Sequence, residues 1–226
     1  MGLIIGMKKN NLIFLLSLMT YSVFTIIFTL HHKLYLYGVN TGTIAFITIA
    51  QKYIMGDFSN AVVGGFTPLS SWLLIPFMKL GMPPIAALSV VKLIVGLLIL
   101  AGIRALSLSF EMSEGMRNVI SFTSVPIVMQ FSLTENIPDL LITCTVIFYL
   151  SVIFRPDYQD KLSSGVRCGV IGSVGYLGKA FMFPFFISHF ILMSILHYYR
   201  TKNSRVWKNM IVGLVAFLVV SAPWII

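Results

Sequence analysis

Three acidic residues and one lysine have side chains and positions that could form a reaction centre. Asp57, Glu135 and Asp139 lie in or beside the polar segments that separate apolar runs, and Lys179 lies beside the apolar string FMFPFF. An ionisable side chain at membrane depth costs about 2.5–3.5 kcal/mol on insertion scales, so it usually has a partner or a task. These four residues are the first candidates for a reaction centre.

Each carboxylate also has an ordinary structural explanation. Asp139 follows Asn136, a candidate helix cap, and Pro138, and a carboxylate in the first turn of a helix complements the helix dipole. Asp57 suits the turn in the string GDFSN, and Glu135 suits a solvated loop. Both interpretations of the three acids stay open at this point.

The remaining polar candidates point to no soluble enzyme or metal site. Lys179 could extend its ammonium group to lipid headgroups. His31 and His32 have no metal-ligand spacing around them. The chain contains no GxSxG, Walker A or HExxH motif. The sequence assigns no cofactor and no metal ligand, and it leaves a divalent metal open.

The elements that hold these residues must be membrane helices. The chain has 226 residues, of which 58% are hydrophobic and 10% charged, and its mean hydropathy is +0.93. A soluble domain is about 45–50% apolar and about 25% charged. This composition excludes a water-soluble globular protein, a disordered chain and a nucleic-acid-binding domain.

The apolar runs predict an all-α fold, a polytopic transmembrane helical bundle. A spanning helix needs about 20 mostly apolar residues, and the runs indicate about seven spans. The first covers residues 11–30, and the others lie near 84–103, 119–131, 140–154, 168–176, 181–196 and 210–226. We expect residues 1–226 to form a single transmembrane module.

Basic residues predict the orientation of this bundle. The net charge is +9. With seven spans, eleven basic residues fall on one side of the membrane: Lys8, Lys9, Arg104, Arg117, Arg155, Lys161, Arg167, Arg200, Lys202, Arg205 and Lys208. The positive-inside rule makes this side, and the N-terminus, cytoplasmic. The parity requires a hairpin turn near residues 178–184, where Pro184 and nearby glycines weaken a helix.

Residues 31–83 then form a long external loop, and external loops of this length are uncommon unless they are functional. Segments 43–53 and 70–80 predict short interfacial helices, and residues 56–69 predict turns because they contain glycine and proline. A second external segment covers residues 134–138. Glycines at 169, 172, 175 and 178 predict close helix packing.

Two strings in these outer segments are distinctive: IAQKYIMGDFSNAVVGGFTPLSSWLLIPFMKLG at residues 49–81 and GYLGKAFMFPF at residues 175–185. An acid near the start of the fourth span, here Asp139, and a closing Pro223-Trp224 accompany them. Together these features resemble the GT-C membrane glycosyltransferases. The nearest group, glycosyltransferase family 39-like, includes the protein O-mannosyltransferases and the lipid A aminoarabinose transferases.

The resemblance implies a reaction at the outer face of a prokaryotic plasma membrane. A sugar is carried on a polyprenyl phosphate, a carboxylate removes a proton from a hydroxyl or amine of a lipid or protein acceptor, and the lipid phosphate leaves. A lysine near that phosphate stabilises the charge that develops on it. The implied catalytic residues are Asp139, Asp57 and Glu135, and the implied substrate-binding residues are Lys179, Asn40 and His32. The implied partners are the donor, the acceptor and membrane lipids.

Two departures from the family pattern keep other functions open. Asn40 stands where the family usually carries an acid, so Asp57 or Asp139 takes the role of base or the chain is inactive. The chain stops inside an apolar run, so we expect it to lack the further C-terminal spans or external domain of its relatives. The alternatives are a non-catalytic membrane subunit that binds a lipid donor and a transporter or flippase with broken fifth and sixth spans.

Overall fold

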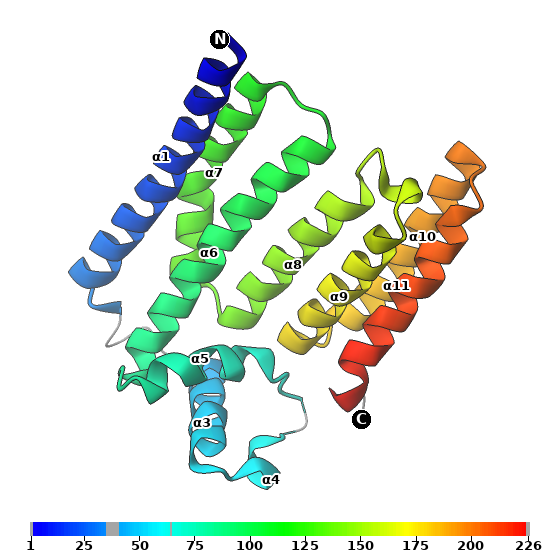
Figure 1. The fold of residues 1–226 in the computed structure, drawn as a ribbon. Coiled ribbons are helices and arrows are strands. Elements are labelled where there is room, and N and C mark those ends of the chain that lie inside the picture. Colours follow the sequence, from blue (N-terminus) through cyan, green and yellow to red (C-terminus); the bar gives the residue numbers. More distant parts are fainter. Residues whose placement is uncertain (1, 35–40, 64, 225–226) are drawn as a thin grey trace.

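The computed structural model describes residues 2–34, 41–63 and 65–224, and every regular element in these residues is a helix (Figure 1). The α-helices are α1 (Gly2–His31), α3 (Thr41–Met55), α4 (Phe58–Ala61), α5 (Leu69–Lys79), α6 (Pro84–Ser109), α7 (Glu114–Thr134), α8 (Ile137–Ile153), α9 (Leu162–Gly178), α10 (Met182–Thr201) and α11 (Arg205–Ser221). Two 3₁₀ helices are η1 (Tyr158–Asp160) and η2 (Ala222–Trp224). The predicted all-α class is confirmed.

The chain is an integral membrane protein. Four segments of the described helices are long and apolar enough to cross a bilayer, namely Leu12–His31, Pro84–Ser109, Met182–Thr201 and Arg205–Trp224. Helices α7, α8 and α9 occupy the three other runs in which the sequence predicts spans. The total of seven spans stays a prediction because α8 and α9 have only 17 residues each.

Helices α1 and α6 to α11 run alternately up and down, and the connections between them lie at two ends of the bundle (Figure 1). These two ends differ in their residues. The connections α6–α7, α8–α9 and α10–α11 lie at the same end as the start of α1, and we call this the basic end after the Arg and Lys residues there. Helices α3, α4 and α5 lie at the opposite end, which we call the lobe end. Helix α9 packs between α8 and α11, and α6 packs against α7 and α8.

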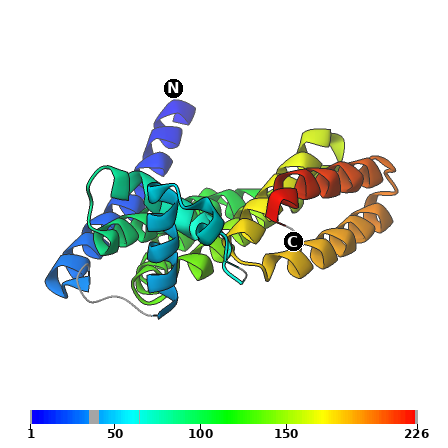
Figure 2. The same ribbon diagram turned by 90° about the horizontal axis from the view of Figure 1, so that it is seen from below.

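Two apolar clusters hold the bundle together. One is centred on α6 and includes Leu88, Val95 and Leu140. The other contains residues of α8, α9, α10 and α11, several of them aromatic. In this cluster the ring centroids of Phe186 and Phe217 lie 4.8 Å apart. Helix α10 contacts α9 and α11 and stands apart from α6 when the molecule is viewed from below (Figure 2).

Glycines allow α9 to approach its neighbours closely, as the spacing predicts. A Cβ atom at Gly169 would lie 2.0 Å from the backbone oxygen of Gly213 on α11, and one at Gly172 would lie 2.6 Å from the ring of Phe186 on α10. No real Cβ atom tolerates such distances, so only glycine fits at these positions without moving a helix. The packing role of this glycine series is confirmed.

The lobe consists of the helices that the sequence predicts within residues 31–83. Helix α3 covers the expected segment 43–53 and α5 nearly covers 70–80. Ser71 Oγ donates to the backbone oxygen of Phe46 at 3.0 Å, which joins the two helices. Trp72 packs its ring against those of Tyr53 and Trp224, so α5 also connects the lobe to the end of α11.

Candidate active site at the lobe end

Asp139 and Lys179 meet at the lobe end although 40 positions separate them in the sequence. Asp139 lies in the first turn of α8, and Lys179 is the residue that directly follows α9. The Lys179 Nζ donates to Asp139 Oδ1, and the two side chains form an ion pair. The structure therefore brings together the carboxylate and the ammonium group that the sequence placed on the same side.

Local structure explains why these two helix ends coincide. A Cβ atom at Gly178 would lie 3.2 Å from Cβ of Leu141, so the last residue of α9 lies directly against α8. The chain then leaves the helix in an extended conformation at Lys179, whose N–H donates to the oxygen of Gly175 at 2.9 Å. The hairpin turn predicted near residues 178–184 is confirmed, because α10 begins at Met182.

Both members of the ion pair remain accessible. The Lys179 side chain is 44% exposed and the Asp139 side chain is 32% exposed. A substrate can therefore reach either group without unfolding a helix. The N-terminal end of α8 also favours negative charge in its first turn, so this position suits Asp139 or an incoming anion.

The lobe contacts the same place through two hydrogen bonds. Thr67 Oγ1 donates to the backbone oxygen of Gly178 at 2.7 Å, one residue before Lys179. Thr43 Oγ1 contacts Asn136 Oδ1 at 3.3 Å, just before α8 begins. Asn136 is the N-cap residue of α8 by position, but its side chain makes no capping bond to the helix; it contacts Thr43 of the lobe.

A cavity of about 270 Å³ opens between the lobe and the helix ends, and Ala180, the residue after Lys179, is part of its lining. The lining comes from α3, from the end of α4 and the segment after it, from the end of α9 and the turn that follows, and from η2: Ile49, Tyr53, Ala61, Val62, Val63, Gly65, Phe66, Thr67, Pro68, Tyr176, Ala180 and Trp224. Four of these side chains are aromatic. Tyr176 Oη donates to the backbone oxygen of Trp224 at 2.9 Å, and Trp224 Nε1 is buried and has no partner among the described residues.

Asp57 makes only local contacts in the described structure. Its carboxylate accepts hydrogen bonds from Asn60 Nδ2 at 2.9 and 3.1 Å and from Ser59 Oγ at 3.3 Å. It forms no hydrogen bond or ion pair with Asp139 or Lys179 within the part of the chain that is described. The contacts are those of a turn between α3 and α4.

Glu135 is closer to Asp139 in sequence than Asp57 is, but its contacts are with residues of α6 and α7. It is the residue that directly follows α7, and its N–H donates to the oxygen of Phe131 at 2.9 Å. Its carboxylate interacts favourably with the ammonium group of Lys92. Lys92 lies in a small hollow between α1, α6 and α7 with Thr25, Ser89 and Ser132, so it faces the bundle interior.

Of the two remaining candidates, the structure describes only His32, and His32 does not join the ion pair. His32 is exposed in the turn after α1, and its ring packs against Phe28 with centroids 4.1 Å apart. Asn40 lies outside the described residues. In residues 2–34, 41–63 and 65–224, no group of three or more His, Cys, Asp or Glu side chains could hold a metal ion.

The sequence did not single out Thr67, Tyr176 and Trp224 as parts of one site. Each lies inside a string that carries the family resemblance, but their types alone do not distinguish a cavity lining from lipid-facing residues. The signal that could have found them is the combination of aromatic residues with glycine and proline at the outer ends of predicted spans.

These features define an integral membrane protein of helical-bundle class with a polar site at the rim of one end. The family model for dolichyl-phosphate-mannose-protein mannosyltransferase matches residues 66–226, and the chain belongs to this family. It is thereby placed among membrane glycosyltransferases that use a lipid-linked sugar donor. The matched region includes Thr67, Asp139, Lys179 and Trp224 but not Asp57. No curated protein and no solved structure matched the chain.

Proposed function

We propose that this protein transfers a sugar from a polyprenyl-phosphate donor to a hydroxyl or amine acceptor, and that Asp139 and Lys179 form the reaction centre. The observation that carries the proposal is their ion pair at the lobe end, where Ala180, the neighbour of Lys179 in sequence, lines an aromatic cavity. Family membership supports the reaction class and the lipid-linked donor. The proposal ranks Asp139 above Asp57 and Glu135 because Asp139 has a phosphate-binding partner beside it.

The proposed reaction begins when the donor phosphate takes the Lys179 ammonium group away from Asp139. The freed carboxylate then accepts the proton of the acceptor hydroxyl or amine. The acceptor oxygen or nitrogen forms a bond to the anomeric carbon of the sugar, and the bond from that carbon to the phosphate oxygen breaks. The electron pair of the broken bond stays on the lipid phosphate, where Lys179 stabilises it.

The cavity beside Lys179 suits the sugar itself. Tyr53, Tyr176 and Trp224 offer aromatic faces against which the C–H face of a pyranose ring can pack. The unpartnered indole N–H of Trp224 is a donor that a sugar hydroxyl can satisfy. We propose that the sugar occupies this cavity and that its phosphate projects toward Lys179.

We further propose that the lobe end faces the outside of a prokaryotic plasma membrane and that the N-terminus is cytoplasmic. The support is that the loops rich in Arg and Lys lie together at the opposite end of the bundle (Figure 1). In this orientation the acceptor is a lipid or protein at the outer face.

The direct test uses Asp139→Asn and Lys179→Gln in membranes supplied with a polyprenyl-phosphate sugar and an acceptor. Each change should lower the transfer rate about 100-fold or more, because the first removes the base and the second removes the charge that stabilises the leaving phosphate. The matched controls are Asp157→Asn and Lys161→Gln, which break an exposed ion pair at the basic end. Transfer that survives Asp139→Asn unchanged would remove this residue from the reaction.

A charge-swapped double variant separates catalysis from a purely structural ion pair. Asp139→Lys combined with Lys179→Asp restores opposite charges at the same two positions. If the pair only ties α8 to α9, the double variant should recover whatever the single changes lost. If the proposal holds, thermal stability recovers but sugar transfer does not, because base and phosphate contact have exchanged places.

A further inference from the structure

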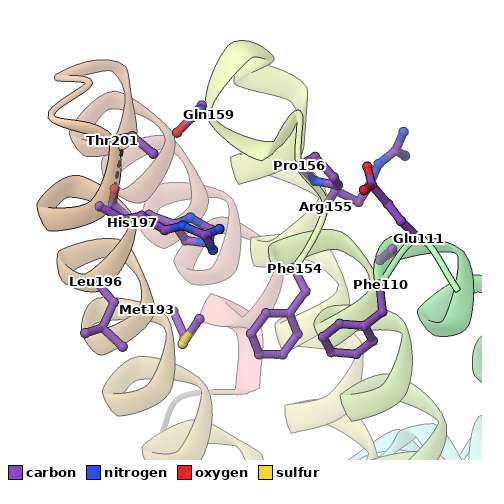
Figure 3. A pocket seen from close by; sticks show the side chains of 12 residues that line it. Phe110, Glu111, Phe154, Arg155, Pro156, Gln159, Met193, Leu196, His197 and Thr201 are labelled. Atoms are coloured by element: carbon purple, nitrogen blue, oxygen red, sulfur yellow. Dashed lines mark hydrogen bonds between the residues drawn. The ribbon is translucent and has the colours of Figure 1, made fainter.

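A second and larger cavity, drawn in Figure 3, lies at the basic end of the bundle. It has a volume of about 690 Å³ and lies between the end of α6, the α8–α9 connection and α10. Phe154, which lines it, follows the last residue of α8, whereas Asp139 lies in the first turn of the same helix. At 1.5 Å per residue the two are about 22 Å apart along the helix axis, so this cavity is not part of the reaction centre.

One part of the cavity is apolar and faces outward. Phe110 and Phe154, the residues that follow α6 and α8, pack with ring centroids 5.3 Å apart. Met193 and Leu196 of α10 face them across the opening (Figure 3). Phe110 and Leu196 are each 50% exposed, which is costly in water and favourable when a hydrocarbon chain covers them.

The polar part presents a guanidinium that has no ion-pair partner among the described residues. Arg155 is paired with Asp157, whose carboxylate lies 3.0 Å from Arg155 Nε. Arg200 also lines the cavity and forms no ion pair among the described residues. The ionic lining residues are Arg155, Arg200 and Glu111, with His197 beside them. The guanidinium of Arg200 is therefore the cation in this lining that a ligand phosphate can contact without breaking an ion pair.

The same part of the cavity also presents a hydrogen-bond acceptor that nothing satisfies. Gln159 Oε1 is buried and has no partner in the described structure, and its side chain points toward α10 in Figure 3. The nearby His197 ring is already engaged, since its Nε2 donates to the backbone oxygen of Ile153 at 2.8 Å and the ring stacks on Tyr158. An unsatisfied buried acceptor is costly, so a ligand that brings a donor is favoured here.

We infer that this cavity binds an anionic phospholipid whose headgroup carries hydroxyl groups. The phosphodiester contacts the guanidinium of Arg200, because arginine suits phosphate oxygens. A headgroup hydroxyl donates to Gln159 Oε1, and an acyl chain covers Phe110, Phe154 and Leu196. The volume lies within the range of about 300–1,000 Å³ that holds ligands of this size, and basic pockets between membrane helices are suited to anionic headgroups.

The charge contact can be tested by direct binding to the purified full chain in detergent. We expect a fluorescent phosphatidylglycerol to bind, and phosphatidylcholine, which has no net charge and no hydroxyl, to compete poorly. Arg200→Gln should weaken binding about tenfold or more. The matched control is Arg205→Gln, an exposed arginine at the start of α11 that does not line the cavity, and it should leave binding unchanged. Equal losses in both variants, or equal binding of the two lipids, would overturn the inference.

Two further measurements test the hydroxyl contact and the source of the ligand. Gln159→Leu should remove the preference for phosphatidylglycerol over phosphatidic acid, which has no headgroup hydroxyl, while thermal unfolding confirms that the variant folds. If the unmodified protein shows no such preference, the hydroxyl contact is wrong. Soluble glycerol 1-phosphate should not displace the lipid. Displacement by it would show that the apolar wall contributes nothing and that the ligand is a soluble phosphate.

Discussion

The reaction centre proposed here consists of two ordinary side chains whose chemistry depends on their surroundings. An exposed ion pair contributes little to stability, typically about 0–1 kcal/mol. The pair of Asp139 and Lys179 is half exposed, so we expect it to add little to stability. An accessible carboxylate held beside an ammonium group is instead well placed to exchange its partner for a substrate phosphate.

Thr67 is the residue whose loss should affect this centre without touching its charges. Its hydroxyl donates to the oxygen of Gly178, directly before Lys179. We expect Thr67→Val to cost about 0.5–1.5 kcal/mol of stability and to reduce sugar transfer by loosening Lys179. Thr67→Ser should keep both, because it retains the hydroxyl.

The control for Thr67→Val is Thr134→Val. The hydroxyl of Thr134 is exposed and donates only to the oxygen of Gln130 within its own helix. Transfer rates and thermal unfolding should be measured for all three variants. Equal effects of the valine changes at positions 67 and 134 would contradict a positioning role for Thr67.

Asp157 at the basic end provides a residue-level prediction about pH. The hydrogen bond from Lys161 holds the pKa of the Asp157 carboxyl below its ordinary value of 3.8, and Arg155 acts in the same direction. A lowered pKa in the folded state means that folding favours the charged form. The stabilisation is therefore complete above pH 3.8 and is lost as the pH falls through the lower folded value.

Because this ion pair is exposed, Asp157→Asn should cost less than about 1 kcal/mol at neutral pH. The difference between the variant and the original protein should disappear in acid. The measurement is thermal unfolding in detergent as a function of pH. A difference that grows as the pH falls would mean that the carboxylate is not stabilised by its cationic neighbours.

At the level of elements, α9 is the helix that sets the geometry of the site. It packs against α8, α10 and α11, and its final residue positions Lys179. The glycines on α9 allow these contacts at backbone distance. A change in the α9–α11 spacing should therefore move Lys179 relative to Asp139.

Gly169→Ala tests this dependence. The added methyl group would lie 2.0 Å from the oxygen of Gly213, and such overpacking typically costs about 1–3 kcal/mol. We expect a lower unfolding temperature together with reduced sugar transfer. Gly115→Ala is the control, because nothing lies within 4 Å of its added methyl group. Equal stability of the two variants would show that α9 and α11 separate at little cost.

For the whole molecule, the proposed orientation can be tested by labelling from one side of the membrane. Cys144 and Cys168 are both free and buried, so they should react slowly with an impermeant maleimide. Ser59→Cys introduces an exposed thiol in α4 at the lobe end, and Ser204→Cys introduces one in the α10–α11 connection at the basic end. We expect the first to be labelled in intact cells and the second only after permeabilisation.

The reverse pattern would place the reaction centre inside the cell and contradict the proposed orientation. Labelling of both thiols in intact cells would contradict the expected number of spans, because the lobe and the α10–α11 connection would then share a side. Each outcome leaves the ion pair intact but changes which donor and acceptor can reach it.

The sequence alone was enough to predict the all-α membrane class, the seven apolar runs that became α1 and α6–α11, the short helices of the lobe and the turn after Gly178. These features depend on local properties, namely the length of an apolar run, glycine and proline, and the distribution of basic residues. The sequence also placed Asp139 and Lys179 among the candidates and favoured Asp139 by its position, but it kept Asp57 and Glu135 beside it.

The tertiary structure decided which candidates meet. Asp139 contacts Lys179 because Gly178 allows the end of α9 to lie against α8, while Asp57 is bonded within its own turn and Glu135 interacts with Lys92. Both cavities also depend on residues from three or more separate elements. Neither pairing nor cavity can be read from local sequence, because each depends on how helices distant in the chain are spaced and where their ends fall relative to one another.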